Sequence, residues 1–152
     1  MLLAEVIREK DYIKKSICGI EDYIKSLMTV QDKTEFKTNK TLIEGRLEEL
    51  KELYKKYQQF SVTIERAKAR ASIKVNDTTL SLLDAVAIKN AMNFKLWNFE
   101  GLLAYASLKN TTMVEVLCID LDVLFKEMEN IKIDIKTLDS EIEYAYWNVE
   151  VS

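Results

Sequence analysis

Hydrophobic residues recur at alternating steps of three and four along three long stretches of the chain, residues 2–29, 40–71 and 121–148. This heptad spacing is typical of helices that pack along one narrow stripe, so it predicts a long helix over each stretch. Lys10 fills one apolar slot of the first stripe. The predicted stripes are Leu3, Val6, Ile13, Ile17, Ile20, Ile24 and Leu27 in the first helix, Ile43, Leu47, Leu50, Tyr54, Tyr57, Ser61 and Ile64 in the second, and Leu121, Leu124, Met128, Ile131, Ile135, Leu138, Ile142, Ala145 and Val149 in the last.

The polar segment 31–39 separates the first two predicted helices. A connection of about nine residues is too short to return the chain in parallel, so these helices are expected to form an antiparallel hairpin. Near the end of the chain, Asp120 directly precedes the last stripe and is expected to cap that helix.

The period changes between the second and last stripes. Residues 72–80 alternate β-branched and polar side chains around Asn76-Asp77, which predicts a small β-hairpin.

Ser81 and Asp84 then fit the capping-box pattern and predict the start of a third helix over about 82–107. That helix is apolar on more than one side, so it is predicted to be the most buried element. Residues 113–117 are a candidate short third strand.

Composition supports this helical interpretation. The 152 residues include three Gly and no Pro, the two residues that most often interrupt helices. The fold class predicted is mainly α, a long antiparallel helical hairpin or bundle with a small β-hairpin insertion, in a single domain over 1–152. The chain contains no His, which removes the commonest general base and metal ligand, and no phosphate-loop, zinc or hydrolase motif is present. An enzyme, a metal site and a cofactor are therefore not expected.

The cysteine content, the first residues and the short uncharged runs lead us to expect a cytoplasmic protein. Cys18 and Cys118 lie far apart in periodic apolar stretches and are predicted to be reduced, buried thiols. The first residues lack the pattern of a secretory signal, and the longest uncharged runs, 57–64 and 101–108, are too short to cross a membrane. With 25 acidic and 22 basic side chains, the chain is not expected to bind nucleic acid or a membrane.

The length of the predicted helices bears on assembly. A helix of 28 residues is about 42 Å long, longer than a compact fold of this size requires. Apolar stripe at its far end would be exposed unless another subunit covered it, so a homo-oligomer is expected. The alternative is an elongated monomeric bundle whose stripes all meet one another. The residues predicted to form the core or the oligomer contact are Leu121, Leu124, Met128, Ile131, Ile135 and Leu138.

A basic segment stands out in this acidic chain. Residues 65–75 hold four basic side chains and one acidic one, and they lie just before the capped start of the third helix. Guanidinium and ammonium groups there could bind an anion, with an aromatic face to stack a ring. The candidate ligand-binding residues are Arg66, Lys68, Arg70, Lys74, Lys89 and Trp97. The alternative is a solvated helix end whose cations pair with the acidic last helix.

Carboxylates at Glu44, Glu48 and Glu52 share one helical face, but Lys51, Lys55 and Lys56 alternate with them. An ion-paired, solvated face is favoured over a di-metal site, which would also need His. Lys10, Asn90 and Asn93 are polar residues within apolar stretches, where each could fix register, line a pocket or reach a local partner.

The arrangement resembles the septicolysin-like family of small helical bacterial and phage proteins. The opening Leu2-Leu3-Ala4-Glu5, the segment Leu80-Ser81-Leu82-Leu83-Asp84-Ala85-Val86 after the hairpin, and the closing Leu138-Asp139-Ser140-Glu141-Ile142 with Asn148-Val149-Glu150 carry the likeness. The chain departs from the family where basic residues 66–70 replace an Asn/Thr-rich run, and in the order Trp147-Asn148. The resemblance implies a helical oligomer and supplies no reaction.

Three functions remain open. The first is a non-enzymatic oligomeric binding or scaffolding protein. The alternative is a phage-type sequestering protein that holds an anionic nucleotide signal with Arg66, Arg70 and Lys89 beside Trp97. A cytolysin-like toxin, which the family name alone suggests, ranks last.

Overall fold

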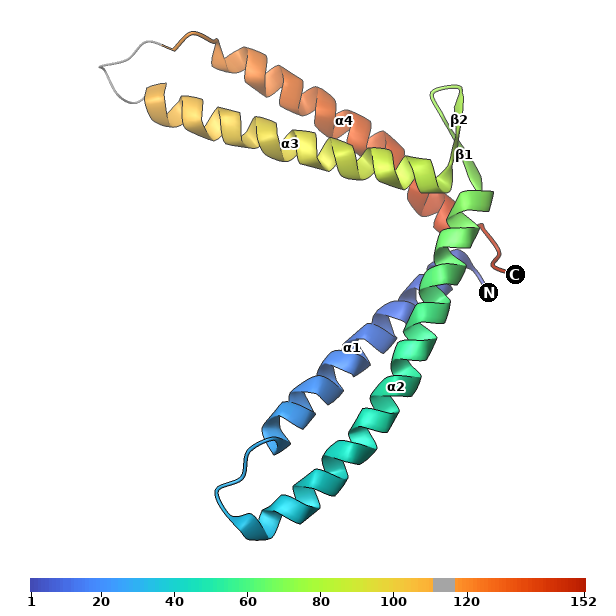
Figure 1. Cartoon of the computed structure of the whole chain (residues 1–152). Coiled ribbons are helices and arrows are strands. Elements are labelled where there is room, and N and C mark those ends of the chain that lie inside the picture. The colour runs from blue at the N-terminus through green and yellow to red at the C-terminus, as the bar shows by residue number, and fades with distance from the viewer. Residues whose placement is uncertain (111–116) are drawn as a thin grey trace. The chain divides into compact units, whose positions relative to one another are not determined.

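The computed structural model describes residues 1–110 and 117–152 and is mainly helical, with one small β-hairpin. This confirms the predicted fold class. Figure 1 shows α1 beside α2 and α3 beside α4, with the hairpin between α2 and α3. The elements in chain order are α1 (Leu3–Leu27), α2 (Lys33–Arg70), β1 (Ser72–Val75), β2 (Thr78–Ser81), α3 (Leu82–Asn110) and α4 (Leu121–Tyr146). The candidate strand 113–117 lies outside the described residues except for Leu117, which is not in a strand.

The contacts divide the chain into two compact units, and their boundary falls inside α2. One unit comprises Met1–Ala67 with Asn148–Ser152, and the other comprises Lys68–Trp147. The single domain expected over 1–152 stays a prediction, and each unit is described by itself below.

The first unit is an antiparallel pair of helices with a shared apolar core. Ile13, Ile17 and Ile24 of α1 cluster with Leu50 of α2, so this part of the first predicted stripe packs within the chain. The C-terminal residues join this unit through the backbone. The Leu3 N–H donates to the Val149 carbonyl at 2.8 Å, and the Val151 N–H donates to the Met1 carbonyl at 2.9 Å.

The stripe of α2 is shifted by one residue from its prediction over part of its length. Leu47 and Tyr54 are 45% and 53% exposed, so their placement in the stripe was wrong. Leu53 and Phe60 pack against the α1 cluster instead. Leu53 and Tyr54 are adjacent apolar or aromatic residues, and α1 covers the face that contains Leu53. The phenol of Tyr54 stays in water, where it needs no buried partner.

α2 also begins earlier than predicted, because the polar segment 33–39 is helical rather than a turn. The Asp32 carboxylate accepts the N–H of Thr34 at 3.1 Å, which caps the new helix start. This bond lowers the pKa of Asp32, since it stabilises the ionised form. The segment contains no Gly or Pro to stop the helix, so a capped polar helix forms where sequence polarity suggested a loop.

The second unit begins with the predicted β-hairpin. β1 and β2 pair antiparallel with Val75 opposite Thr78, which leaves Asn76 and Asp77 as a two-residue turn. Both turn residues have positive φ, 49° and 65°, as a type I′ turn requires. The Ser81 Oγ then accepts the N–H of Asp84 at 3.0 Å, confirming the predicted cap of the third helix.

α3 and α4 pack side by side in the second unit. Asp120 caps α4 as predicted, with its carboxylate accepting the Asp122 N–H at 3.0 Å. The predicted stripe is buried or half-buried from Leu121 to Ala145, and Leu138 and Ile142 are only 3% and 1% exposed. Val149 was wrongly placed in this stripe, because α4 ends at Tyr146 and Val149 belongs to the first unit. The structure thus places this stripe in a core formed within one chain.

Both cysteines are free thiols, and both are exposed, so the prediction that they are buried was wrong. Cys18 follows Ile17, which faces the core of the first unit. Successive residues of a helix point about 100° apart, so this neighbour of a buried position turns away from the stripe.

Candidate functional site: an exposed apolar face on α3

α3 has two apolar faces, and α4 covers one of them. The inner face is buried or half-buried and repeats at steps of three and four. It consists of Leu82, Ala85, Lys89, Met92, Leu96, Phe99, Leu103 and Ala106. The second face follows the same spacing on the opposite side of the helix, and every member is exposed. This outer face consists of Leu83, Ala87, Asn90, Phe94, Trp97, Gly101, Ala104 and Leu108, with Tyr105 beside it.

Large apolar side chains at the middle of the outer face lie in solvent. Phe94 is 63% exposed and Trp97 68%, and their rings stack with centroids 6.1 Å apart and planes 25° apart. Tyr105 is 64% exposed and lies about two to three turns further on. The prediction that the third helix is the most buried element was therefore wrong for the single chain. α3 is apolar on two sides, but within its own unit α4 packs on one.

The outer face carries no charged side chain over the 26 residues from Leu83 to Leu108, because the charges of α3 lie at other helical positions. An isolated exposed Leu or Phe is ordinary on a protein surface, but an uncharged, mainly apolar stripe along a whole helix is not. Exposed apolar faces of this size mark sites that bind another protein, a ligand or a membrane.

Two of the basic residues predicted to bind an anion are ion-paired. Lys89 lies on the inner face of α3 and pairs with Asp139 of α4 at 2.5 Å. Lys74 pairs with Asp77 within the β-hairpin at 3.7 Å. Lys89 thus follows the alternative interpretation, in which the cations pair with the acidic last helix.

Three of the remaining anion candidates lie at the end of α2. Arg66 and Arg70 are four residues apart, about one helical turn, and Lys68 lies between them in sequence. Lys68 has an interaction of its own. Trp97 lies on the outer face of α3 with its ring against Phe94, while Lys89 lies on the inner face.

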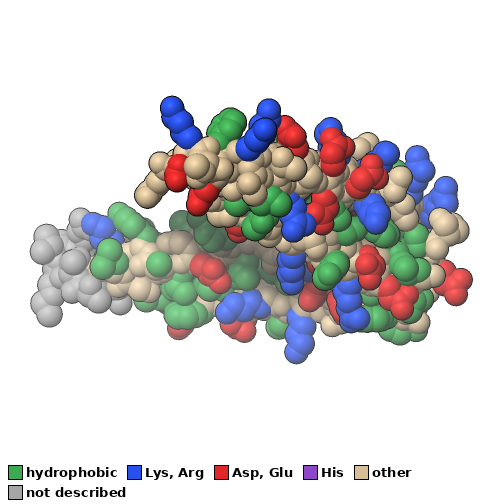
Figure 2. Space-filling view, turned by 90° about the horizontal axis from the view of Figure 1, so that it is seen from below, with side chains coloured by type: hydrophobic (Ala, Val, Ile, Leu, Met, Phe, Trp, Pro, Cys, Tyr) green, Lys and Arg blue, Asp and Glu red, His purple; other side chains and the backbone are tan. Residues whose placement is uncertain are grey.

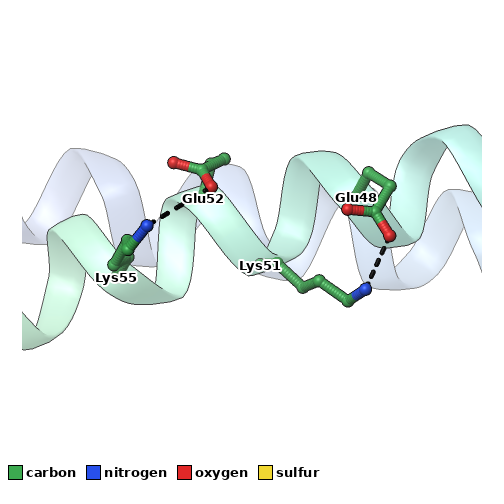
Figure 3. A network of polar contacts seen from close by, with 4 residues as sticks. All are labelled: Glu48, Lys51, Glu52 and Lys55. Carbon is green, nitrogen blue, oxygen red and sulfur yellow. Dashed lines mark hydrogen bonds and ion pairs between the residues drawn. The ribbon is translucent and has the colours of Figure 1, made fainter.

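The acidic face of α2 is ion-paired, as predicted. Lys51 pairs with Glu48 at 2.6 Å and Lys55 pairs with Glu52 at 3.7 Å, both along the helix surface (Figure 3). Lys40 reaches Glu44 at 4.0 Å. Among the described residues, no group of three or more Cys, Asp or Glu side chains is placed to hold a metal ion.

The polar residues within apolar stretches have local explanations. The Lys10 ammonium lies 5.1 Å from the centre of the Tyr57 ring, a cation–π contact that accommodates a cation in the first stripe. Asn90 and Asn93 of α3 are exposed rather than buried.

Other charges are distributed without a dominant patch on the face drawn in Figure 2, where basic and acidic side chains are interspersed with exposed hydrophobic ones. Two basic groups have raised pKa values because each pairs with a carboxylate, Lys25 with Glu21 and Arg46 with Glu49. Neither belongs to α3. Within the described part of the chain, no helix is both long enough and apolar enough to span a membrane.

Comparison with known proteins bears on the fold alone. No protein-family model matches the chain, and no curated protein sequence does. The structure is similar to the crystal structure of a functionally unknown conserved protein from Corynebacterium diphtheriae, with a TM-score of 0.82 and 16% identity. The match covers 100% of this chain and 99% of the other. This pair of helical hairpins with a β-hairpin insertion is thus a fold that a distant sequence also adopts.

The composition of the third helix indicates that it is apolar on more than one side, but it does not separate the two faces. The signal that separates them is the second run of steps of four and three, which begins at Leu83 and reaches Leu108. Asn90 and Gly101 interrupt the run of apolar residues and hide it from a search for hydrophobic heptads alone.

Proposed function

We propose that this chain is a non-enzymatic, cytoplasmic protein of the septicolysin-like type that assembles with copies of itself and acts as a binding or scaffolding protein. The single observation that carries the proposal is the exposed outer face of α3, centred on the stacked rings of Phe94 and Trp97. The family assignment draws on the similar residues at the opening, after the β-hairpin and at the close of the chain, and on the shared fold of a conserved protein.

The chemistry of the outer face favours a protein partner over a small ligand. Its side chains lie in a row along one helix and are exposed, whereas small-molecule sites are concave. Tryptophan, tyrosine and phenylalanine are enriched at the centres of protein interfaces, where they contribute most of the binding energy. Phe94, Trp97 and Tyr105 supply this set on one helix.

Helix length suggested that the ends of the long apolar stripes would need a second subunit to cover them. The structure favours assembly for a different reason. The apolar stripes of α1 and α4 pack within the chain, so they need no second subunit to cover them. What favours assembly is a face that no element of the second unit covers. Leu124 and Ile131, predicted to form the core or the oligomer contact, are only 5% and 4% exposed, and in this proposal they act as core.

The absence of His and of recognisable catalytic motifs supports a non-enzymatic role. The candidate anion-binding residues give less support to nucleotide sequestration, because Lys74 of the β-hairpin and Lys89 of α3 already pair with carboxylates.

Light scattering coupled to size-exclusion chromatography tests the proposal through a matched pair of variants. Phe94 and Phe36 are 63% and 62% exposed, but Phe36 lies near the start of α2 in the first unit. We expect the wild-type mass to be at least twice the chain mass of 17.7 kDa. Phe94→Glu should lower that mass, because it places a charge in the apolar contact, and Phe36→Glu should leave it unchanged. A wild-type mass of one chain at all concentrations would contradict assembly.

A further inference from the structure

The outer face of α3 is self-complementary when two copies run antiparallel. Resting on the proposed function, we propose that it pairs with the same face of a second copy around a two-fold axis that passes between Phe94 and Trp97. The observation behind this is the order of side-chain sizes along the face. Large side chains stand at both ends and at the centre, so a reversed copy of the face places large positions opposite large ones.

In an antiparallel pair of heptad helices, each layer joins one residue to the residue at the mirrored position of the partner. Placing the outer face against a reversed copy of itself therefore determines which two residues meet in each layer. The layers are Leu83 with Leu108, Ala87 with Ala104, Asn90 with Gly101, and Phe94 with Trp97, and each occurs twice about the axis. Large residues meet large residues at the centre and both ends, and small residues meet small ones between them.

Gly101, the one member of the outer face without a side chain, favours the antiparallel direction over a parallel one. A parallel pair in register would place Gly101 opposite Gly101 and leave a gap in the contact, because neither residue has a side chain. The antiparallel pair places Asn90 opposite Gly101 and fills that space. A Cβ added at Gly101 meets nothing within 4 Å in the single chain, so its own chain leaves the position open.

Flanking residues are also compatible with the antiparallel pair. The two acidic side chains that border the outer face are Asp84 and Glu100. The same reversal places Asp84 beside Tyr105 of the other copy and Glu100 beside Asn93, so each carboxylate faces a hydrogen-bond donor rather than another carboxylate. The opposed helix dipoles add a further favourable term.

The exposed area is of the size that such a contact needs. A fully buried aromatic side chain covers about 150–250 Å². At their exposed fractions, Phe94, Trp97 and Tyr105 together offer on the order of 400 Å² per copy. A stable interface buries about 800 Å² on each partner. The three aromatic residues thus supply about half of it, and the other members of the outer face extend the contact along about 38 Å of helix.

Cysteine cross-linking tests the layer assignment directly. In a background with Cys18→Ser and Cys118→Ser, one preparation carries Ala87→Cys and another carries Ala104→Cys. Helices packed 8–10 Å apart bring facing Cα atoms to about 4–5 Å, within the range that a disulfide bridges. Two copies of residue 87 would instead lie about 25 Å apart along the axis. After subunit exchange and mild oxidation, we expect a covalent dimer in the mixture and none in either preparation alone.

A third preparation with Ala91→Cys is the matched control, because Ala91 is another exposed alanine of α3. Mixed with Ala87→Cys, it would place its thiol about 20 Å from the other and should not cross-link. A disulfide in the Ala87→Cys preparation alone would overturn the antiparallel direction in favour of a parallel one. An oligomer by light scattering with no cross-link in the mixture would overturn the pairing and leave the proposed assembly standing. A monomer by light scattering would overturn both.

Discussion

Truncation of Leu138 in α4 separates a core within one chain from a contact between chains. Leu138 is 3% exposed and belongs to the stripe buried in the second unit. Leu138→Ala removes three buried carbon atoms and leaves a cavity, which costs about 2–5 kcal/mol of unfolding free energy in well-packed cores. For a domain of this size, 1 kcal/mol shifts the melting temperature by about 2–4 °C, so we expect a fall of about 4–20 °C. Far-ultraviolet circular dichroism during heating and urea titration measures both quantities.

Leu102→Ala is the matched control for that experiment. Leu102 is 55% exposed on α3 and lies outside both of its apolar faces. The same substitution there should change stability by less than about 0.5 kcal/mol. Below its melting temperature, Leu138→Ala should keep the wild-type mass, because its side chain does not contact another copy. The reasoning is refuted if Leu138→Ala lowers the mass while leaving the melting temperature unchanged.

Three further outcomes test local features of the fold. Gly19→Ala should raise the unfolding free energy by about 1 kcal/mol in a urea titration, because the site is helical and nothing lies within 4 Å of an added Cβ; a loss of stability would show that the site is crowded. Asp77→Ile should cost about 1–2 kcal/mol because φ is 65° there, whereas Asp77→Gly should not, and thermal melts compare the two. Asp32 should titrate below the ordinary range of an aspartate in carboxyl NMR. Because its folded pKa is depressed, the stability that it contributes is present above the unfolded pKa and is lost as the pH falls through the folded pKa. An ordinary titration would contradict the cap on the Thr34 N–H.

The parts of the fold that could be predicted are those in which one register of apolar residues repeats without a break. The stripe of α4 is such a case, since apolar residues fill every step of three and four from Leu121 to Ala145, whereas the exposed Val123, Phe125 and Ile133 form no such run. The turn at Asn76-Asp77 and the caps at Ser81 and Asp120 were predictable for a similar reason. Each depends on a local hydrogen bond or backbone angle that few other residues satisfy.

Other features depend on partners that the sequence does not specify. On α2, Leu53 and Tyr54 are adjacent and both could enter the stripe, and only the position of α1 decides that Leu53 does. On α3, either of two apolar faces could be buried, and α4 packs against the one that contains Leu96. The candidate site is the apolar face of α3 that α4 leaves exposed. The composition of α3 shows that it has more apolar surface than one face, but the spacing does not say which face α4 covers.

Quenching of Trp97 fluorescence by acrylamide tests the central claim most directly, because it reports on the outer face of α3 in the unmodified contact. A Trp147→Phe variant leaves Trp97 as the sole tryptophan, and this indole is 68% exposed in the single chain. If the outer face is covered by a second copy, the native protein should be quenched several-fold less efficiently than the same protein unfolded in urea, and dilution that lowers the mass should remove the protection. Quenching as efficient in the native protein as in the unfolded one, at every concentration, would contradict the account.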